Sequence, residues 1–131
     1  MTVTFITAGF IGLLMIYTMI NTGIMRGKTK TLLGEGDDIY LLGAIRAHGN
    51  LTEYAPIALI LIGAMEYMQT NATLVMGMGT VFVVARVCHA IGLIKHPDRE
   101  KNTLRALGAI GTLTVMVVAS ITVLIKAYGL M

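Results

Sequence analysis

Charged residues are scarce in this chain of 131 residues. Asp, Glu, Lys and Arg make up 13% of it, while 56% of the residues are apolar. A soluble globular domain carries about a quarter charged residues, roughly twice this share. The scarcity of charge therefore excludes an ordinary soluble domain and indicates a membrane protein.

Two long segments lack charge altogether, because no Asp, Glu, Lys or Arg occurs in residues 2–25 or 106–125. A helix of about 20 apolar residues crosses a ~30 Å hydrocarbon core. Two further apolar segments carry a few polar residues. We therefore expect an all-α integral membrane protein, a single domain over residues 1–131 with four transmembrane helices at about 2–25, 39–68, 72–94 and 104–127. The first run is too long for a signal peptide and lacks its basic n-region.

The sequence also lacks the usual marks of several kinds of site. One cysteine and three histidines show no metal-ligand spacing, so we expect no metal. No phosphate-binding glycine loop and no Gly-x-Ser-x-Gly elbow occurs. No basic stripe is interleaved with aromatic residues, so we expect no nucleic-acid partner. We expect the single cysteine, Cys88, to be a small, buried and inert residue of the third helix.

Basic residues gather in two of the three connections and predict the orientation. The first connection, about Arg26–Asp38, and the third, about Lys95–Thr103, lie on one side of a four-helix bundle, and the opposite side carries only Lys126. By the positive-inside rule the first and third connections are cytoplasmic and both termini lie outside. We expect a multi-pass protein of a cell inner membrane. The basic residues of the two connections are Arg26, Lys28, Lys30, Lys95, Arg99 and Lys101.

The second helix carries polar side chains inside an apolar segment. Arg46, Asn50 and Glu53 lie at i, i+4 and i+7, so they share one stripe, with Tyr54 on its flank. His48 points to a different face, toward another helix or another subunit. Ionisable side chains at membrane depth are costly and mark a functional site by default. The stripe is therefore the first candidate site, and Pro56, just after it, predicts a kink.

Further cations are expected at the same depth. Arg86 and His89 share a face of the third helix, and Arg105 begins the fourth. The excess of cations over the one carboxylate, Glu53, favours an anionic ligand, because arginine is a planar fork suited to carboxylates. Purely structural roles remain open: an Arg46–Glu53 ion pair, an Arg86 side chain that extends to the interface, and Asn50 bonded between helices.

These residues resemble a known family. The motif from Arg46 to Pro56, RAHGNLTEYAP, looks like the second-helix signature of the membrane-associated proteins in eicosanoid and glutathione metabolism (MAPEG). The segment from Ala85 to Gly92, ARVCHAIG, resembles the family's third-helix segment, and Arg105 matches a further family arginine. The resemblance covers nearly the whole chain and is closest to microsomal glutathione transferases.

The resemblance implies a homotrimer that binds glutathione between subunits. Glutathione would be a co-substrate, and the other partners would be membrane lipids and a lipophilic small-molecule substrate. Arg105 would be catalytic and stabilise the thiolate, since a guanidinium lowers a thiol pKa from about 8.5. The implied glutathione-binding residues are Arg26 and His48 from the adjacent subunit, together with Arg46, Asn50, Glu53, Tyr54, Arg86 and His89.

The resemblance implies a membrane-embedded glutathione-dependent transferase or peroxidase that acts on lipophilic electrophiles or lipid hydroperoxides. One departure is Leu93, which stands where the leukotriene-forming members have a second tyrosine. The alternative is therefore a non-enzymatic lipid-binding or scaffold protein of the same fold. A small four-helix transporter is a third class, but such proteins place an acid in their first helix, and residues 2–25 have none.

Overall fold

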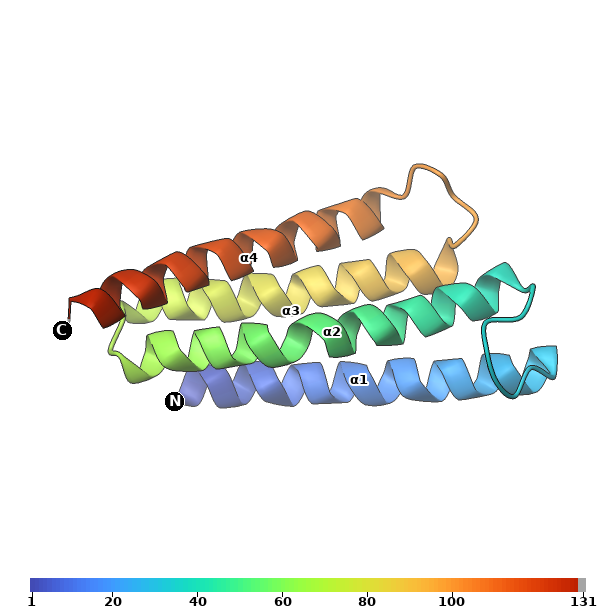
Figure 1. The fold of residues 1–131 in the computed structure, drawn as a ribbon, viewed down its shortest axis with the longest axis horizontal. Coiled ribbons are helices and arrows are strands. Elements are labelled where there is room, and N and C mark those ends of the chain that lie inside the picture. Colours follow the sequence, from blue (N-terminus) through green and yellow to red (C-terminus); the bar gives the residue numbers. More distant parts are fainter. Residues whose placement is uncertain (130–131) are drawn as a thin grey trace.

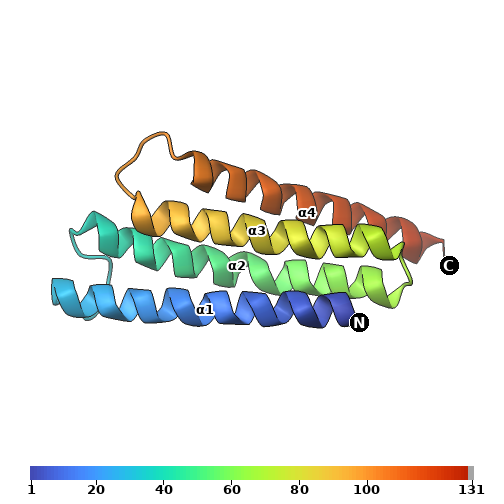
Figure 2. The same cartoon turned by 180° about the vertical axis from the view of Figure 1, so that it is seen from behind.

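Four helices lie side by side in the computed structural model (Figure 1). They are α1 (Thr2–Thr29), α2 (Ile39–Tyr67), α3 (Ala72–Lys95) and α4 (Thr103–Tyr128). The structure describes residues 1–129, and residues 130–131 of the expected domain lie outside this range. Successive helices run in opposite directions, and both views show each helix beside the next one in sequence (Figure 1; Figure 2). One end of the bundle therefore carries residues 30–38 and 96–102.

The first helix is longer than the sequence predicts. It continues four residues past the expected end at residue 25 and stops where Lys30 adopts a left-handed conformation, with φ 54° and its N–H bonded to the Arg26 carbonyl. Arg26 thus lies in the last turn of α1 and not in the connection. A charged side chain does not by itself end a helix, because the backbone N–H and C=O groups of that residue still form the helical hydrogen bonds.

The other three helices begin with a polar cap. The side chains of Asp38, Asn71 and Asn102 accept hydrogen bonds from backbone N–H groups in the first turns of α2, α3 and α4. Such caps satisfy donors that have no partner within the helix. Pro56 lies inside α2, and the helix continues through it.

The core forms where apolar side chains of different helices meet, with Phe82, Ile62 and Val115 almost fully enclosed. Helices α3 and α4 approach each other closely, because a Cβ on Gly108 would lie 2.5 Å from the carbonyl oxygen of Ala85. Small residues permit such close approach in membrane helices. In α1, by contrast, a Cβ on Gly9 or Gly12 would meet nothing within 4 Å.

Three of the helices, α1, α3 and α4, are long and apolar enough to cross a membrane. The chain is therefore a multi-pass membrane protein. The helix that falls short in hydropathy is α2, since it contains the polar segment from Arg46 to Tyr54. Its length of 29 residues corresponds to about 43 Å of helix, enough to span the ~30 Å hydrocarbon core.

Candidate functional site

A cavity of about 250 Å³ lies among α2, α3 and α4, in the half of the bundle nearer residues 30–38 and 96–102. Four of its lining residues were expected site residues: Asn50 and Tyr54 from α2, and Arg86 and His89 from α3. The structure therefore brings together two parts of the candidate site that are more than 30 residues apart in sequence. Its other lining residues, which were not expected, are Ala109, Thr112, Leu113 and Met116.

Arg86 is the most deeply buried charge of the site, with 3% of its surface exposed. Its Nη1 donates to the Asn50 carbonyl at 3.4 Å, and its Nη2 donates to the Gly108 carbonyl at 3.2 Å. The guanidinium carbon lies 5.6 Å from the centre of the Tyr54 ring, close enough for a cation–π contact. Arg86 therefore connects three helices and does not extend to the interface, as one structural alternative proposed.

The Arg86 charge has no acidic partner within residues 1–129. The ion pair in this range joins Glu66 and the α-amino group of Met1, at the opposite end of the bundle. The Nε atom of Arg86 is enclosed and makes no hydrogen bond in the same range. Backbone carbonyls satisfy two of its nitrogens but leave the charge uncompensated, so the cavity is suited to a negatively charged ligand.

His89 and Asn102 hold the backbone of Arg105 from two sides. Nδ1 of His89 lies 3.0 Å from the Arg105 carbonyl oxygen, and Oδ1 of Asn102 accepts the Arg105 N–H at 3.1 Å. Asn102 also donates to the carbonyls of Gly92 and His96, at 2.7 and 3.0 Å. The Asn102 side chain thus caps the start of α4 and bonds backbone carbonyls at the end of α3. Sequence analysis missed this residue, although an asparagine before an apolar helix is a recognised start signal.

The side chain of Arg105 is exposed and lies outside the cavity. It lines a separate groove of about 520 Å³ at the start of α4, with Asn102, Lys101 and Ala109 among the other lining residues. Ala109 lines both the groove and the cavity. Because Arg105 is four residues before Ala109, the two lie on the same face of α4, one turn apart. The expected thiolate-stabilising arginine is therefore next to the cavity.

Arg46 and Glu53 project from the outer face of α2 and are exposed. Within residues 1–129 they form no ion pair with each other, so the structural alternative that pairs them is not what the structure shows. Asn50 donates to the Arg46 carbonyl at 2.8 Å, which leaves its own oxygen to face the cavity. Of the predicted stripe, Arg46 and Glu53 thus face outward from this chain, while Asn50 lines the cavity.

Arg26 and His48 lie apart from the cavity. The Nη1 atom of Arg26 donates to three carbonyls of the first connection, those of Thr31, Leu32 and Gly34. Nδ1 of His48 lies 3.0 Å from the Thr18 hydroxyl of α1. Both residues were expected to reach the ligand of an adjacent subunit, and in this single chain they pack against α1 and its connection.

Two other sequence expectations concern α3. Leu93, the departure from the family pattern, is 8% exposed and packs with Ala47 and Ala90 in the core between α2 and α3. It does not line the cavity. Cys88 is partly exposed rather than buried. The groups of histidine, cysteine and acidic residues within residues 1–129 include no set of three that would hold a metal.

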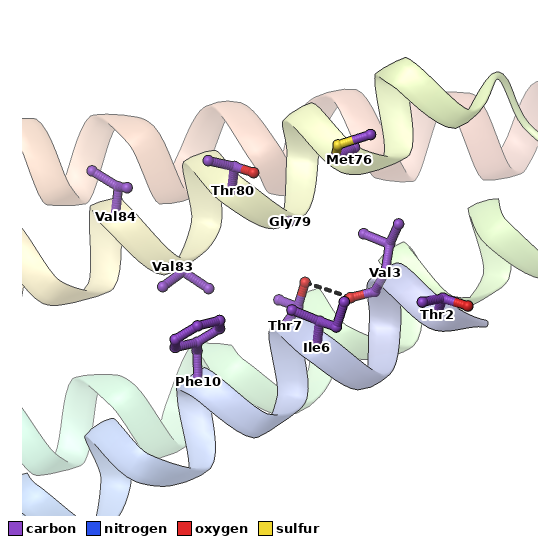
Figure 3. Close-up of a pocket in the computed structure, with 10 residues that line it drawn as sticks. All are labelled: Thr2, Val3, Ile6, Thr7, Phe10, Met76, Gly79, Thr80, Val83 and Val84. Atoms are coloured by element: carbon purple, nitrogen blue, oxygen red, sulfur yellow. Dashed lines mark hydrogen bonds between the residues drawn. The ribbon is translucent and has the colours of Figure 1, made fainter.

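A larger hollow of about 470 Å³ lies between α1 and α3, toward the other end of the bundle. Figure 3 shows its walls, with Phe10 and Ile6 on α1 facing Val83 on α3. The Thr7 hydroxyl donates to the Val3 carbonyl within its own helix, at 2.8 Å. The hollow thus offers an almost wholly apolar surface, in contrast to the cavity around Arg86.

Comparison with known proteins found both a family and relatives. The sequence model of the MAPEG family matches residues 4–125. The inner membrane protein YecN of Escherichia coli strain K12 is 35% identical over 68 residues, and so is YecN of Escherichia coli O6:H1. The match covers 52% of this chain and 52% of each relative, so the chain spans about half the length of the curated relatives it matches. No solved structure matches the chain.

Proposed function

The chain belongs to the MAPEG family, and on that premise we propose that it is a membrane-embedded glutathione-dependent transferase or peroxidase. Its second substrate is a lipophilic electrophile or a lipid hydroperoxide. One observation carries the proposal: Arg86 is buried in a cavity together with Asn50, Tyr54 and His89, and no acid among residues 1–129 compensates its charge. An anionic ligand supplies the missing negative charge.

Glutathione matches the charges around the cavity. It has two carboxylates, one ammonium group and a thiol. Arg86 and Arg46 are suited to the carboxylates, because a guanidinium binds a carboxylate through two parallel hydrogen bonds. Glu53, the one carboxylate of the α2 stripe, is suited to the ammonium group. Asn50 and Tyr54 add neutral hydrogen-bonding groups at the cavity wall.

Arg105 is the proposed catalytic residue. Its position one turn from the cavity on the same face of α4 supports a role at the sulfur of the bound tripeptide. A guanidinium near the thiol stabilises the thiolate, which is the reactive nucleophile. The apolar second substrate then approaches from the bilayer.

A homotrimer explains why Arg46 and Glu53 face outward from α2. Charged side chains within a membrane rarely face lipid, and these two are exposed in the single chain. A neighbouring copy packed on this face removes them from lipid. The neighbour's Arg26 and His48 then complete the site, since among residues 1–129 the hydrogen bonds of each side chain use one of its nitrogens.

The proposed location is a cell inner membrane, as for the relative named inner membrane protein YecN. We propose that all four helices cross it, because α2 lies between α1 and α3 in the bundle (Figure 1). The basic connections 30–38 and 96–102 then lie in the cytoplasm, and both termini lie outside.

A glutathione titration of the detergent-purified full chain tests the proposal. We expect saturable binding and a rise in melting temperature at millimolar glutathione, since a ligand that binds only the folded state stabilises it. We also expect conjugation to chlorodinitrobenzene, an apolar aryl chloride. A glutathione analogue with a methyl group in place of the thiol is the matched control: it should bind without turnover. Neither binding nor turnover at millimolar glutathione would contradict the proposal.

The alternative function is non-enzymatic lipid binding on the same fold. The apolar hollow between α1 and α3 favours it, because its walls suit an acyl chain and offer few polar groups (Figure 3). Under this alternative the purified protein retains a lipid through gel filtration, and glutathione leaves its melting temperature unchanged. The same titration therefore separates the two functions.

A further inference from the structure

The hydrogen bond between His89 and Arg105 fixes which ring nitrogen of His89 carries a proton. Nδ1 lies 3.0 Å from the Arg105 carbonyl oxygen. A carbonyl oxygen only accepts hydrogen bonds, so Nδ1 must carry the hydrogen, and the neutral ring then has a lone pair on Nε2. His89 therefore presents a proton acceptor on the side of the ring opposite Arg105.

This Nε2 atom belongs to a side chain that lines the cavity. Within residues 1–129 it makes no hydrogen bond, because the one bond of the His89 ring is made by Nδ1. It is also absent from the enclosed side-chain atoms without a partner in that range, which are Nδ2 of Asn21, Oγ1 of Thr70 and Nε of Arg86. An atom that is neither bonded nor enclosed is open to a ligand.

The other polar groups of the cavity wall are poor proton acceptors. Arg86 has only donors, and the Thr112 hydroxyl already donates to the Gly108 carbonyl at 2.9 Å. Asn50 and Tyr54 are neutral groups contributed by α2. The charged groups nearest the ring are Arg86 on α3 and Arg105 on α4, both cations. Nε2 of His89 is therefore the basic atom of this wall.

Resting on the proposed function, we propose that His89 is a catalytic residue that accepts the thiol proton of bound glutathione. The S–H bond breaks, the proton moves to Nε2, and sulfur keeps the electron pair. With chlorodinitrobenzene the sulfur then bonds to the ring carbon and chloride leaves with its bonding pair. The imidazolium afterwards releases its proton to water.

The Arg105 carbonyl orients the ring for this step. It holds Nδ1 and so leaves Nε2 as the free nitrogen of the ring, and it also stabilises the imidazolium that forms. The carboxylate that bonds the histidine of a hydrolase triad does the same. The backbone of Arg105 thus positions the base, while its side chain is proposed to stabilise the thiolate. Arg105 therefore acts on both groups of the proton transfer, on His89 through its carbonyl and on the thiol through its side chain.

The substitution His89→Asn tests the role of Nε2. The asparagine amide keeps a donor near the position of Nδ1 but has no basic atom. We expect the glutathione dissociation constant to stay within about threefold, because the hydrogen bond to Arg105 is kept. We expect turnover of chlorodinitrobenzene to fall about 100-fold, as for loss of a general base. The difference in turnover between His89→Asn and the wild type should decrease as pH approaches the free thiol pKa of about 8.5, because the thiol then ionises without a base.

The same substitution at His96 is the matched control. His96 lies in the connection 96–102, does not line the cavity, and contributes hydrogen bonds through its backbone. We expect His96→Asn to retain wild-type turnover. If His89→Asn also retains turnover within about twofold of the wild type while glutathione binds, general-base catalysis by His89 is overturned and the proposed function stands. If the wild type binds no glutathione, both fail.

A second measurement covers the case in which His89→Asn does not fold. The ultraviolet absorbance of bound glutathione reports its thiolate fraction at neutral pH without any second substrate. We expect His89→Gln to show a lower thiolate fraction than the wild type. Equal fractions in the two proteins would overturn the proposal.

Discussion

The two ends of the bundle use polar groups in opposite ways. At the end that carries residues 68–71 and the start of α1, the Glu66 carboxylate accepts hydrogen bonds from the N–H groups of Val3 and Thr4, at 3.0 and 2.8 Å. In the half nearer residues 30–38 and 96–102, Arg86 is buried with no acidic partner among residues 1–129. Glu66 therefore stabilises the fold, whereas Arg86 costs folding free energy and indicates a ligand.

The first end is locked by complementary partners. Glu66 caps α1, and Nζ of Lys126 donates to the Met68 carbonyl at 2.8 Å, which ties α4 to the connection after α2. Backbone groups at helix ends are partial charges, so a carboxylate at the start of α1 and an ammonium at the end of α2 are both favourable. Glu66 and Lys126 at this end thus have partners within the fold.

The largest expected effect is on ligand binding at the second end. Arg86→Met removes the buried cation and keeps an unbranched apolar chain in place of the arginine methylenes, so we expect glutathione affinity to fall at least about 100-fold, or about 2.8 kcal/mol. We expect stability to change by less than about 1 kcal/mol, because removing an uncompensated charge offsets the two lost hydrogen bonds. Calorimetric titration and thermal unfolding measure the two quantities. If Arg86→Met binds glutathione with unchanged affinity, Arg86 does not bind the ligand, and the proposed difference between the two ends is wrong.

A pair of glycine substitutions separates packing from charge. Gly108→Ala places a methyl group against the Ala85 carbonyl and His89, at 2.5 to 2.6 Å, and we expect a loss of about 2 kcal/mol of stability. Gly9→Ala meets nothing within 4 Å and should stabilise α1 by about 0.5 kcal/mol through helix propensity. Chemical unfolding in detergent measures both. If Gly9→Ala is the more damaging change, Gly9 packs against another copy of the chain.

A smaller loss of stability than that of Gly108→Ala is expected at Glu66. Glu66→Gln removes the negative charge that bonds the first turn of α1, and we expect a loss of about 1.5 kcal/mol of stability. Glutathione affinity should stay unchanged, since Glu66 is at the opposite end from the cavity. Glu35→Gln, an exposed acid of the first connection, is the control and should change neither quantity. A loss of glutathione affinity in Glu66→Gln would contradict the assignment of ligand binding to the other half of the bundle.

Much of the fold followed from patterns that are local in sequence. Charge-free runs and the polar segment from Arg46 predicted four helices. The main error in their limits was the end of α1, because Arg26 was taken for a connection residue when it continues the helix. The start of α4 was recognisable from Asn102, but its bonds to Gly92 and His96 were not, since these depend on how α3 ends.

The candidate site was predictable in membership but not in arrangement. Spacing placed Arg46, Asn50 and Glu53 on one stripe, yet the stripe could face the core, a neighbouring chain or another helix. Periodicity gives the angle between residues around a helix. Only the packing of α1 and α3 against α2 decides which face of α2 is exposed. In the structure Asn50 lines the cavity while Arg46 and Glu53 are exposed.

By itself the sequence determined an all-helical membrane protein, its family and the residues at which polar chemistry concentrates. The reason is that the hydrocarbon core of a membrane tolerates few charged residues, so each charged residue within an apolar segment is easy to recognise in the sequence. Only the tertiary structure decided that Arg86 is buried between three helices without an acid and that His89 donates to the Arg105 carbonyl. Burial and hydrogen-bond direction depend on neighbours from other helices, which no local pattern specifies.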